Sequence, residues 1–343
     1  MTNAQAAKPK KVKSQKIRVK FERTSFFTRF RLKYFNANFW KNVVFVLFRL
    51  VLLLGISYVI LFPFFAKISA SFMTPADFVD PTVKLIPKYP SIETYQNIIK
   101  YNHYFKALFN TAVLSVLTAL LQTFVCAVIG YGFAKFKFRG STLIFVLVMF
   151  TMIVPHQTLR VDMPIFFGHF DLWRICETLG IGTLSLNNTY MPLVLLSITG
   201  LGFKNGLYIF MMRQFYRGVP DELEESAYID GYGVFQTFLK IIIPLSVPMM
   251  ITIFLFSFSW QWTDGFYTTI FFTDMKNKLY LMPDVINVTD LMKNLSVADE
   301  IKDTYTNAVS NTCGLMVILP LIIIYLFCQR YLIQGIERSG IVG

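Results

Sequence analysis

Residues 220–244 read Pro220-Asp-Glu-Leu-Glu-Glu-Ser-Ala-Tyr-Ile-Asp-Gly231-Tyr-Gly-Val-Phe-Gln-Thr-Phe-Leu-Lys-Ile-Ile-Ile-Pro244, the longest amphipathic and acid-rich stretch between two strongly apolar segments. Pro220 suits a first helical turn, where its missing N–H would have no partner anyway, and the acids after it suit the positive end of a helix dipole. Gly231 permits a sharp reversal that a residue with a Cβ would resist. Pro244 is expected to end or kink the second helix. The stretch therefore predicts two short helices, broken at Gly231, that project between two membrane spans.

The composition is that of an integral membrane protein. Of the 343 residues, 55% are hydrophobic and only 15% are charged, whereas soluble domains carry about 25% charged residues. The apolar residues gather in long uncharged runs, as membrane spans do. We therefore expect an all-α fold with six transmembrane helices, of which the third is the shortest. The six runs are about 43–66, 107–134, 142–158, 189–212, 246–272 and 305–329.

The distribution of lysine and arginine predicts which side of the membrane the termini occupy. With six spans, the segments on the side of the N-terminus carry 20 Lys and Arg, and the three loops on the other side carry nine. Because basic residues are retained on the cytoplasmic side, both termini and residues 220–244 are expected to be cytoplasmic.

Residues 1–41 form a basic tail with 12 Lys and Arg and a single acid, Glu22. Its first half is polar and lysine-rich, which is typical of disorder. The second half interleaves aromatic and basic residues, which predicts an amphipathic helix on the inner membrane surface. Membrane orientation explains this charge better than binding to nucleic acid does. No cleavage-type small-residue site follows the first apolar run, so we expect no signal peptide.

Three loops are expected on the outer side, at about 68–105, 159–188 and 273–304. The last is rich in charge of both signs and is longer than a hairpin requires. We interpret it as a contact surface for an external partner, and a solvated loop without a specific role is the alternative.

The sequence contains no arrangement that predicts catalysis. It lacks the G-x-x-x-x-G-K-[ST] phosphate loop, so we do not expect it to bind ATP by that device. Its histidines, His103, His156 and His169, are far apart and form no H-x-x-x-H ligand pair. The four cysteines have neither metal-site nor disulfide-framework spacing. We therefore expect no directly bound metal or cofactor.

The 220–244 stretch also carries a family resemblance. Glu-Ser-Ala at 225–227, then Gly231, then Ile-x-Ile-Pro at 241–244 is similar to the EAA loop of ABC-importer permeases, whose pattern is E-A-A, three residues, G, nine residues and I-x-L-P. Ser226 replaces an alanine and Ile243 replaces a leucine, while the spacing is the same. In the family this loop is the coupling helix that docks into a cleft on a cytoplasmic ATPase. A surface helix pair on another kind of membrane protein is the alternative.

Three further segments extend the resemblance over about residues 40–343. They are 131–140 (Tyr-Gly-Phe-Ala-Lys-Phe-Lys-Phe-Arg-Gly), 258–260 (Phe-Ser-Trp) and 329–343 (Gln-Arg-Tyr-Leu-Ile-Gln-Gly-Ile-Glu-Arg-Ser-Gly-Ile-Val-Gly), which are similar to segments of maltose-transporter-like, MalG-type permeases. In the last of these, Ile341 replaces an alanine of the family pattern, and the lysine before the final glycine is absent. The basic tail and the lengthened outer loops are not typical of the family.

This resemblance implies the MetI/MalG-like fold and the transmembrane subunit of a binding-protein-dependent ABC importer, most similar to those for oligosaccharides. The implied partners are a second permease in a heterodimer, two cytoplasmic ATPase subunits, an extracytoplasmic solute-binding protein and the lipid of the cell membrane. ATP and Mg²⁺ would bind to the ATPase subunits, so this chain would not itself be an enzyme. The residues implied to couple to the ATPase are Asp221, Glu224, Glu225, Ser226, Ala227, Tyr228, Asp230, Gly231 and Pro244 in the loop, and Gln334, Gly335 and Gly340 in the C-terminal tail.

Candidate residues of the transport pathway are polar and aromatic side chains within the apolar runs. Charges there are costly, and they are functional by default, while aromatic rings can stack on sugar rings whose hydroxyl groups bind polar neighbours. These criteria select His156, Lys204, Trp260, Trp262, Asp264 and Tyr267. The alternatives are that Lys204 extends to the membrane surface, that His156 is a satisfied polar group of the bundle, and that the aromatic residues form an interfacial belt.

Two other functions stay open at this point. The chain could belong to an importer for a different solute, such as an amino acid, a polyamine or a peptide, although segments 131–140 and 329–343 favour a carbohydrate. It could instead be a stand-alone channel or secondary transporter, which would not need an acidic cytoplasmic knob and would be expected to show internal repeats.

Overall fold

The computed structural model consists of helices joined by turns and short loops, which confirms the all-α prediction for the part of the chain it describes. That part comprises residues 37–171, 175–178, 180, 182–202, 204–274, 279–295 and 297–338, with side chains from residue 40 to residue 332 apart from 175 and 176. Most of the expected basic tail therefore lies outside the described residues. The chain divides into two units, one ending at Phe64 and the other beginning at Phe65.

Four helices within the described residues are long and apolar enough to cross a membrane. They correspond to the first, second, fifth and sixth expected spans. The helix that corresponds to the fifth expected span is continuous from α12 through the π-helical segment η3 into α13. The four are α2 (Ala37–Ala70), α5 (Tyr104–Lys135), the α12–η3–α13 helix (Val234–Thr237, Phe238–Ile242, Ile243–Trp262) and α17 (Lys302–Arg338).

The third and fourth expected spans are not single long helices, which corrects the sequence prediction. α6 (Ser141–Thr151) has 11 residues, which cover only about 16 Å of a hydrocarbon core about 30 Å thick. The fourth run divides into α9 (Met191–Ile198) and α10 (Asn205–Arg217). Gly200 and Lys204, between them, both have positive φ angles, which a right-handed helix does not contain. Apolar composition shows where a run lies but not whether its backbone is continuous.

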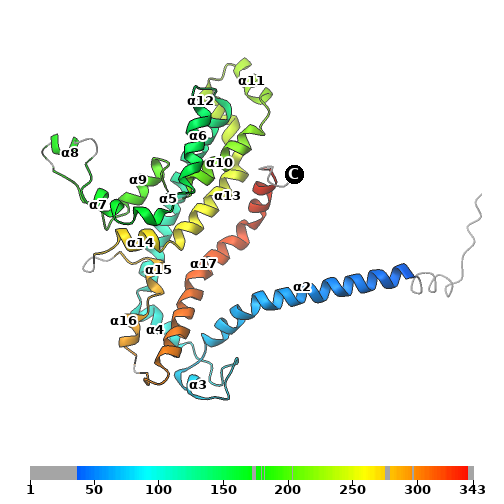
Figure 1. Ribbon diagram of the computed structural model, residues 1–343, viewed down its shortest axis with the longest axis vertical. Helices are drawn as coiled ribbons and strands as arrows, with labels where there is room; N and C mark the ends of the chain where they lie inside the picture. The colour runs from blue at the N-terminus through cyan, green and yellow to red at the C-terminus, as the bar shows by residue number, and fades with distance from the viewer. Residues whose placement is uncertain are drawn as a thin grey trace, which may run out of the picture. The chain divides into compact units, whose positions relative to one another are not determined.

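α5 is the central helix of residues 65–343, because α9, α10 and α13 all pack against it (Figure 1). α5 and α10 approach closely at Gly130, where a Cβ would lie 2.5 Å from the Cβ of Met212. Only glycine fits such a crossing. α5 also places a stripe of small or polar side chains in the interior at helical spacing, namely Thr111, Ser115, Thr118, Gln122 and Cys126.

Short helices complete this unit. α11 and α12 lie at one end of the helical bundle, while α4, α15 and α16 lie toward the other end (Figure 1). α17 packs against α13 and α4. A four-residue 3-10 segment, η1 (His156–Leu159), follows α6. The short helices are α3 (Pro75–Val79), α4 (Glu93–Tyr101), α7 (Asp162–Gly168), α8 (Ile175–Thr178), α11 (Glu222–Ile229), α14 (Phe266–Phe271), α15 (Met282–Val285) and α16 (Thr289–Lys293).

The last expected outer loop is a packed layer in its described part. The N–H of Met282 donates to Thr111 Oγ1 of α5 at 2.8 Å. Asn102 Nδ2 donates to the carbonyl oxygen of Val285 at 2.6 Å, and Leu291 is fully buried. Apolar residues thus fix this layer to α4, α5 and α17, and charged side chains remain on its surface. The surface charges include the exposed i,i+3 pairs Asp290–Lys293 and Asp299–Lys302.

Candidate functional site: a coupling element and a polar pocket

α11 and α12, here called the coupling element after the role that the sequence predicts for them, form the expected helix pair, and the break falls at Gly231 as expected. α11 ends in a Schellman motif: the N–H of Tyr232 donates to the Ala227 carbonyl at 2.9 Å. The N–H of Gly231 donates to the Tyr228 carbonyl at 3.1 Å. Gly231 has φ +86°, a left-handed conformation that costs a residue with a Cβ about 1–2 kcal/mol. The reversal therefore depends on this glycine.

The two sides of α11 differ in exposure. Glu224 and Ala227 are 8% and 2% exposed, whereas Leu223 and Tyr228 are each 42% exposed and Ile229 is 86% exposed. Glu224 and Ala227 therefore face the rest of the protein, where they hold α11 in position. A contact of these two residues with an ATPase stays a prediction. The predicted coupling residues that remain exposed are Asp221, Glu225, Ser226, Tyr228, Asp230, Gly231 and Pro244.

An ion-pair cluster joins the start of α11 to Lys135, the last residue of α5. Lys135 Nζ lies 3.3 Å from Glu224 Oε1 and 2.5 Å from Asp221 Oδ1. It also donates to the carbonyl oxygen of Val219 at 2.8 Å. The hydroxyl of Tyr131, one turn earlier in α5, donates to Glu224 Oε2 at 3.3 Å. The hydrogen bond from Lys135 holds the pKa of the exposed Asp221 below its usual range.

Sequence reasoning did not select Lys135 or Tyr131 as functional residues. Both lie in the 131–140 segment, which served only to support the resemblance. The available signal was a lysine placed directly at the end of a long uncharged run. Its partners are 86 residues away at Asp221 and 84 residues away at Val219, so no local pattern connects them.

Pro244 does not end the second helix, which corrects that part of the prediction. One helix runs from Val234 to Trp262. The five residues before α13 form the π-helical η3. A π turn widens the spacing of backbone hydrogen bonds, so it accommodates a proline that lacks an N–H and whose ring would crowd the preceding turn. The coupling element is therefore continuous with the apolar helix α13.

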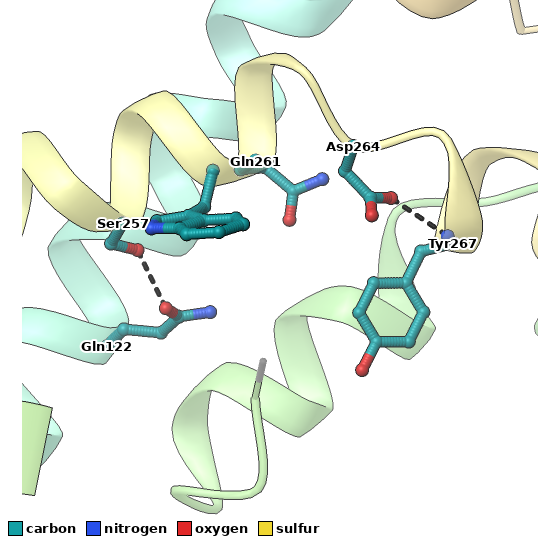
Figure 2. Close-up of a pocket in the computed structure, with 6 residues that line it drawn as sticks. Gln122, Ser257, Gln261, Asp264 and Tyr267 are labelled. Carbon is teal, nitrogen blue, oxygen red and sulfur yellow. Dashed lines mark hydrogen bonds between the residues drawn. The ribbon is translucent and has the colours of Figure 1, made fainter. Parts of the chain in front are cut away.

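A small polar pocket lies between α5, the end of α13 and the start of α14 (Figure 2). Asp264 Oδ2 accepts hydrogen bonds from the N–H groups of Tyr267 at 2.9 Å and Thr268 at 3.3 Å, and so caps the first turn of α14. The structure thus brings together three of the predicted pathway residues. The lining consists of Gln122, Ser257, Trp260, Gln261, Asp264 and Tyr267. Amide and carboxylate groups beside the exposed ring of Trp260 can bind hydroxyl groups and stack on a ring.

Gln122 links this pocket to α9 and was not selected from the sequence. Its Oε1 accepts a hydrogen bond from Ser257 Oγ at 2.7 Å, and its Nε2 donates to Ser197 Oγ at 3.2 Å. A Cβ on Gly202 would lie 2.7 Å from Nε2, so a glycine leaves room for the amide. The feature of the sequence that could have identified Gln122 is an amide side chain within an uncharged span. The partners lie 135 and 75 residues away, which only the fold reveals.

Two other predicted pathway residues lie beside the pocket lining. Lys204 Nζ is 4.8 Å from the centre of the Trp260 ring. The imidazole of His156 makes an edge contact with the ring of Phe266, with centroids 4.8 Å apart. Phe266 immediately precedes Tyr267 of the pocket, so sequence positions 156, 204 and 260 converge on one region.

Trp262 lies apart from this group, and its place in the pathway stays a prediction. It is 2% exposed, and its indole N–H donates to the carbonyl oxygen of Val317 in α17 at 2.9 Å. Two residues along a helix correspond to a rotation of about 200°, so Trp260 and Trp262 point to opposite sides of α13. Trp262 packs α13 against α17.

The candidates in the C-terminal tail are described only in part. Gln334 and Gly335 lie in the last turns of α17, while Gly340 lies outside the described residues. Their contact with an ATPase stays a prediction. Among the residues that the structure describes, no three His, Cys, Asp or Glu side chains gather into a group that could hold a metal ion.

The sequence is similar to those of two bacterial permease proteins. The chain is 28% identical over 291 residues to the arabinooligosaccharides transport system permease protein AraQ of Bacillus subtilis, covering 84% of this chain and 92% of that protein. It is 24% identical over 306 residues to the polygalacturonan/rhamnogalacturonan transport system permease protein YtcP of the same bacterium, covering 88% and 100%.

The fold is similar to a chain of a bacterial ABC transporter involved in the import of the acidic polysaccharide alginate, with a TM-score of 0.64 and 22% identity, covering 85% of this chain and 97% of that one. Residues 123–338 match the family of the binding-protein-dependent transport system inner membrane component. That match spans more than half of the chain and includes the coupling element and most of the pocket. The protein belongs to the inner membrane components of binding-protein-dependent transport systems.

Proposed function

We propose that this chain is the permease subunit of an ATP-driven importer that receives a carbohydrate of the oligosaccharide class from a solute-binding protein. The observation that carries the proposal is the coupling element, a helix pair reversed at Gly231 and continuous with a membrane-length helix. It presents exposed acids beside exposed apolar side chains. Such an element suits mechanical contact with another protein, which would supply ATP and Mg²⁺.

In this proposal the chain crosses the inner membrane six times and has both termini in the cytoplasm. The four long helices would supply four crossings, and α6 and the α9–α10 run would supply the other two. Broken helices are tolerated at membrane depth where protein surrounds them, and α9 and α10 both pack on α5. The excess of Lys and Arg on the inner segments supports this orientation.

The partners in this proposal are a second permease, two ATPase subunits and an extracytoplasmic solute-binding protein. One similar solved structure, with a TM-score of 0.61 and 14% identity, is a bacterial alginate ABC transporter in complex with an alginate pentasaccharide-bound periplasmic protein. In the present chain, the layer of α4, α15 and α16 lies toward the end opposite the coupling element (Figure 1). We assign the binding-protein contact to that layer and the ATPase contact to the coupling element.

The polar pocket would be part of the solute's path. Trp260, which is 47% exposed, offers a ring for stacking, and Gln261 and Asp264 offer polar groups for sugar hydroxyls, while Gln122, Ser257 and Tyr267 are buried behind them. Closure of the ATPase dimer would move the coupling element and shift the helices from inward-open to outward-open, by the differential binding of ATP to the two states. The protein's part in the cycle is positional and not chemical.

The ATPase contact is tested by co-expressing the chain with candidate ATPase and permease subunits and purifying through a tag on this chain. An ATPase should co-purify at a fixed ratio, and vesicles containing the complex and its binding protein should take up solute only with ATP inside. A chain that transports alone, or that binds no ATPase, would contradict the proposal.

The solute class is tested by a binding screen on the external solute-binding protein, followed by uptake of the ligand found. The screen should include neutral and uronate-containing oligosaccharides, amino acids, polyamines and peptides. We expect an oligosaccharide to bind and to be imported. Import of an amino acid, polyamine or peptide would refute the carbohydrate assignment and leave the importer assignment intact.

A further inference from the structure

The attachment of α11 to α5 is unusual because it places a charged pair in the interior. The side chains of Lys135 and Glu224 are 9% and 10% exposed, whereas that of Asp221 is 80% exposed. Removing one member of a buried ion pair leaves an uncompensated charge, which is strongly unfavourable. Lys135 and Glu224 therefore hold α5 and α11 together, and Asp221 adds a contact that water screens.

Aromatic packing makes this attachment rigid. Tyr131 donates to Glu224, and its ring lies 4.7 Å from that of Phe238 in η3 and 5.6 Å from that of Tyr216 in α10. Tyr216 in turn donates to Ser246 of α13 at 3.2 Å. The end of α5 is thus fixed to α10, α11 and the start of the helix that follows the coupling element.

The same helix reaches the polar pocket. Lys135 is 13 residues after Gln122 on the uninterrupted α5, a separation of about 20 Å. Gln122 contacts Ser257 of the pocket and Ser197 of α9. A displacement imposed on α11 therefore moves Lys135, and with it the amide that holds the pocket together.

We propose that Lys135 is a positioning residue that clamps the coupling element to α5, so that movement of α11 is transmitted along α5 to Gln122 and the pocket. This inference rests on the proposed function, because the movement would be imposed by the partner ATPase. Because its side chain is buried, Lys135 would act in this arrangement without touching the solute or the ATPase. Its role is to couple them.

The test compares Lys135→Met, Glu224→Gln and Lys135→Arg in the complete transporter, reconstituted with its binding protein. The quantity measured is solute imported per ATP hydrolysed. Methionine keeps the length of the side chain without charge, and glutamine keeps the volume of Glu224 and its bond from Tyr131. We expect both to lower the ratio about tenfold, within the usual range of coupling between sites, while ATP hydrolysis continues. Lys135→Arg, which keeps the charge, should retain most of the wild-type ratio.

An unchanged ratio in either Lys135→Met or Glu224→Gln would overturn the proposal. A second measurement does not depend on transport: thermal unfolding of the purified complex for Lys135→Met, Glu224→Met and the double variant. We expect each single variant to lower the Tm by several degrees and the double variant to be no worse than the worse single one. Additive losses would show that the two side chains are not coupled. A wild-type complex without ATP-dependent uptake would instead count against the proposed function alone.

Discussion

α5 contacts its neighbours through charge at Lys135 and through neutral groups at Gln122. At Lys135 it meets a buried carboxylate, and loss of one partner in such a pair costs about 3–5 kcal/mol. At Gln122 an amide meets two hydroxyl groups, and an unsatisfied partner there costs about 1–3 kcal/mol. The charged contact is suited to staying closed throughout the transport cycle. The neutral contact costs less to break, so it is better suited to opening during the cycle.

Gly231→Pro, in the turn between α11 and α12, should have the largest effect on transport. Proline fixes φ near −65° and has no N–H, whereas Gly231 has φ +86° and donates to Tyr228. We expect ATP-driven uptake to be abolished while the chain still reaches the membrane. The measurement is uptake in vesicles beside quantification of the chain in the membrane fraction.

The matched control for that variant is Gly233→Ala. Gly233 has φ −78° and open space where a Cβ would be, so alanine should support near-normal uptake. Gly231→Ala also has space but requires the left-handed conformation, so it should fall between the two. Normal transport by Gly231→Pro would refute the coupling role of the reversal.

Gln122→Leu tests the neutral contact that Gln122 makes with Ser257 and Ser197. Leucine removes both hydrogen bonds and leaves the buried Ser257 without its acceptor, a loss of about 1–3 kcal/mol. We expect uptake to fall about tenfold, since 1.4 kcal/mol corresponds to a factor of ten. The control is Ser115→Ala on the same helix, because Ser115 Oγ has no hydrogen-bond partner among the residues that the structure describes. Equal effects of the two variants would argue against a special role for Gln122.

The two tryptophans of α13 separate transport from packing. Trp260 lines the pocket and is 47% exposed, so Trp260→Ala should weaken solute uptake severalfold with little change in Tm. Trp262→Phe loses the bond to Val317 and should destabilise the protein by about 1 kcal/mol without changing which solutes are imported. Uptake competition and thermal unfolding distinguish these outcomes. If Trp262→Phe changed solute uptake and Trp260→Ala changed only the Tm, the pathway would not pass through this pocket.

Asp221→Asn should have the smallest effect. Asp221 pairs with Lys135 at 2.5 Å, but its side chain is 80% exposed. Solvent and salt screen such a pair, so most surface ion pairs contribute little. We expect less than a twofold change in uptake, detectable mainly at low ionic strength. An effect as large as that of Glu224→Gln would show that burial does not distinguish the two acids.

The coupling element was predictable because its signals are local. Gly231 at a reversal and acids at the start of a helix act within a few residues, so the sequence places the helix pair and its break correctly. The faces of α11 were not predictable in the same way. Glu224 and Glu225 are adjacent and chemically alike, and only the position of Lys135 determines that one is buried and the other exposed.

The sequence by itself determined that this is a helical membrane protein with a reversed helix pair between apolar segments, since hydropathy and glycine conformation are properties of the local chain. Only the tertiary structure decided that the fourth apolar run divides into α9 and α10, that the helix passes through Pro244, and that Trp260 faces the pocket while Trp262 faces α17. The partners of Gln122 and Lys135 were decided there too. The contacts of Gln122 and Lys135 join residues about 75 to 135 positions apart. The sequence around one residue of such a pair does not indicate which distant residue is its partner.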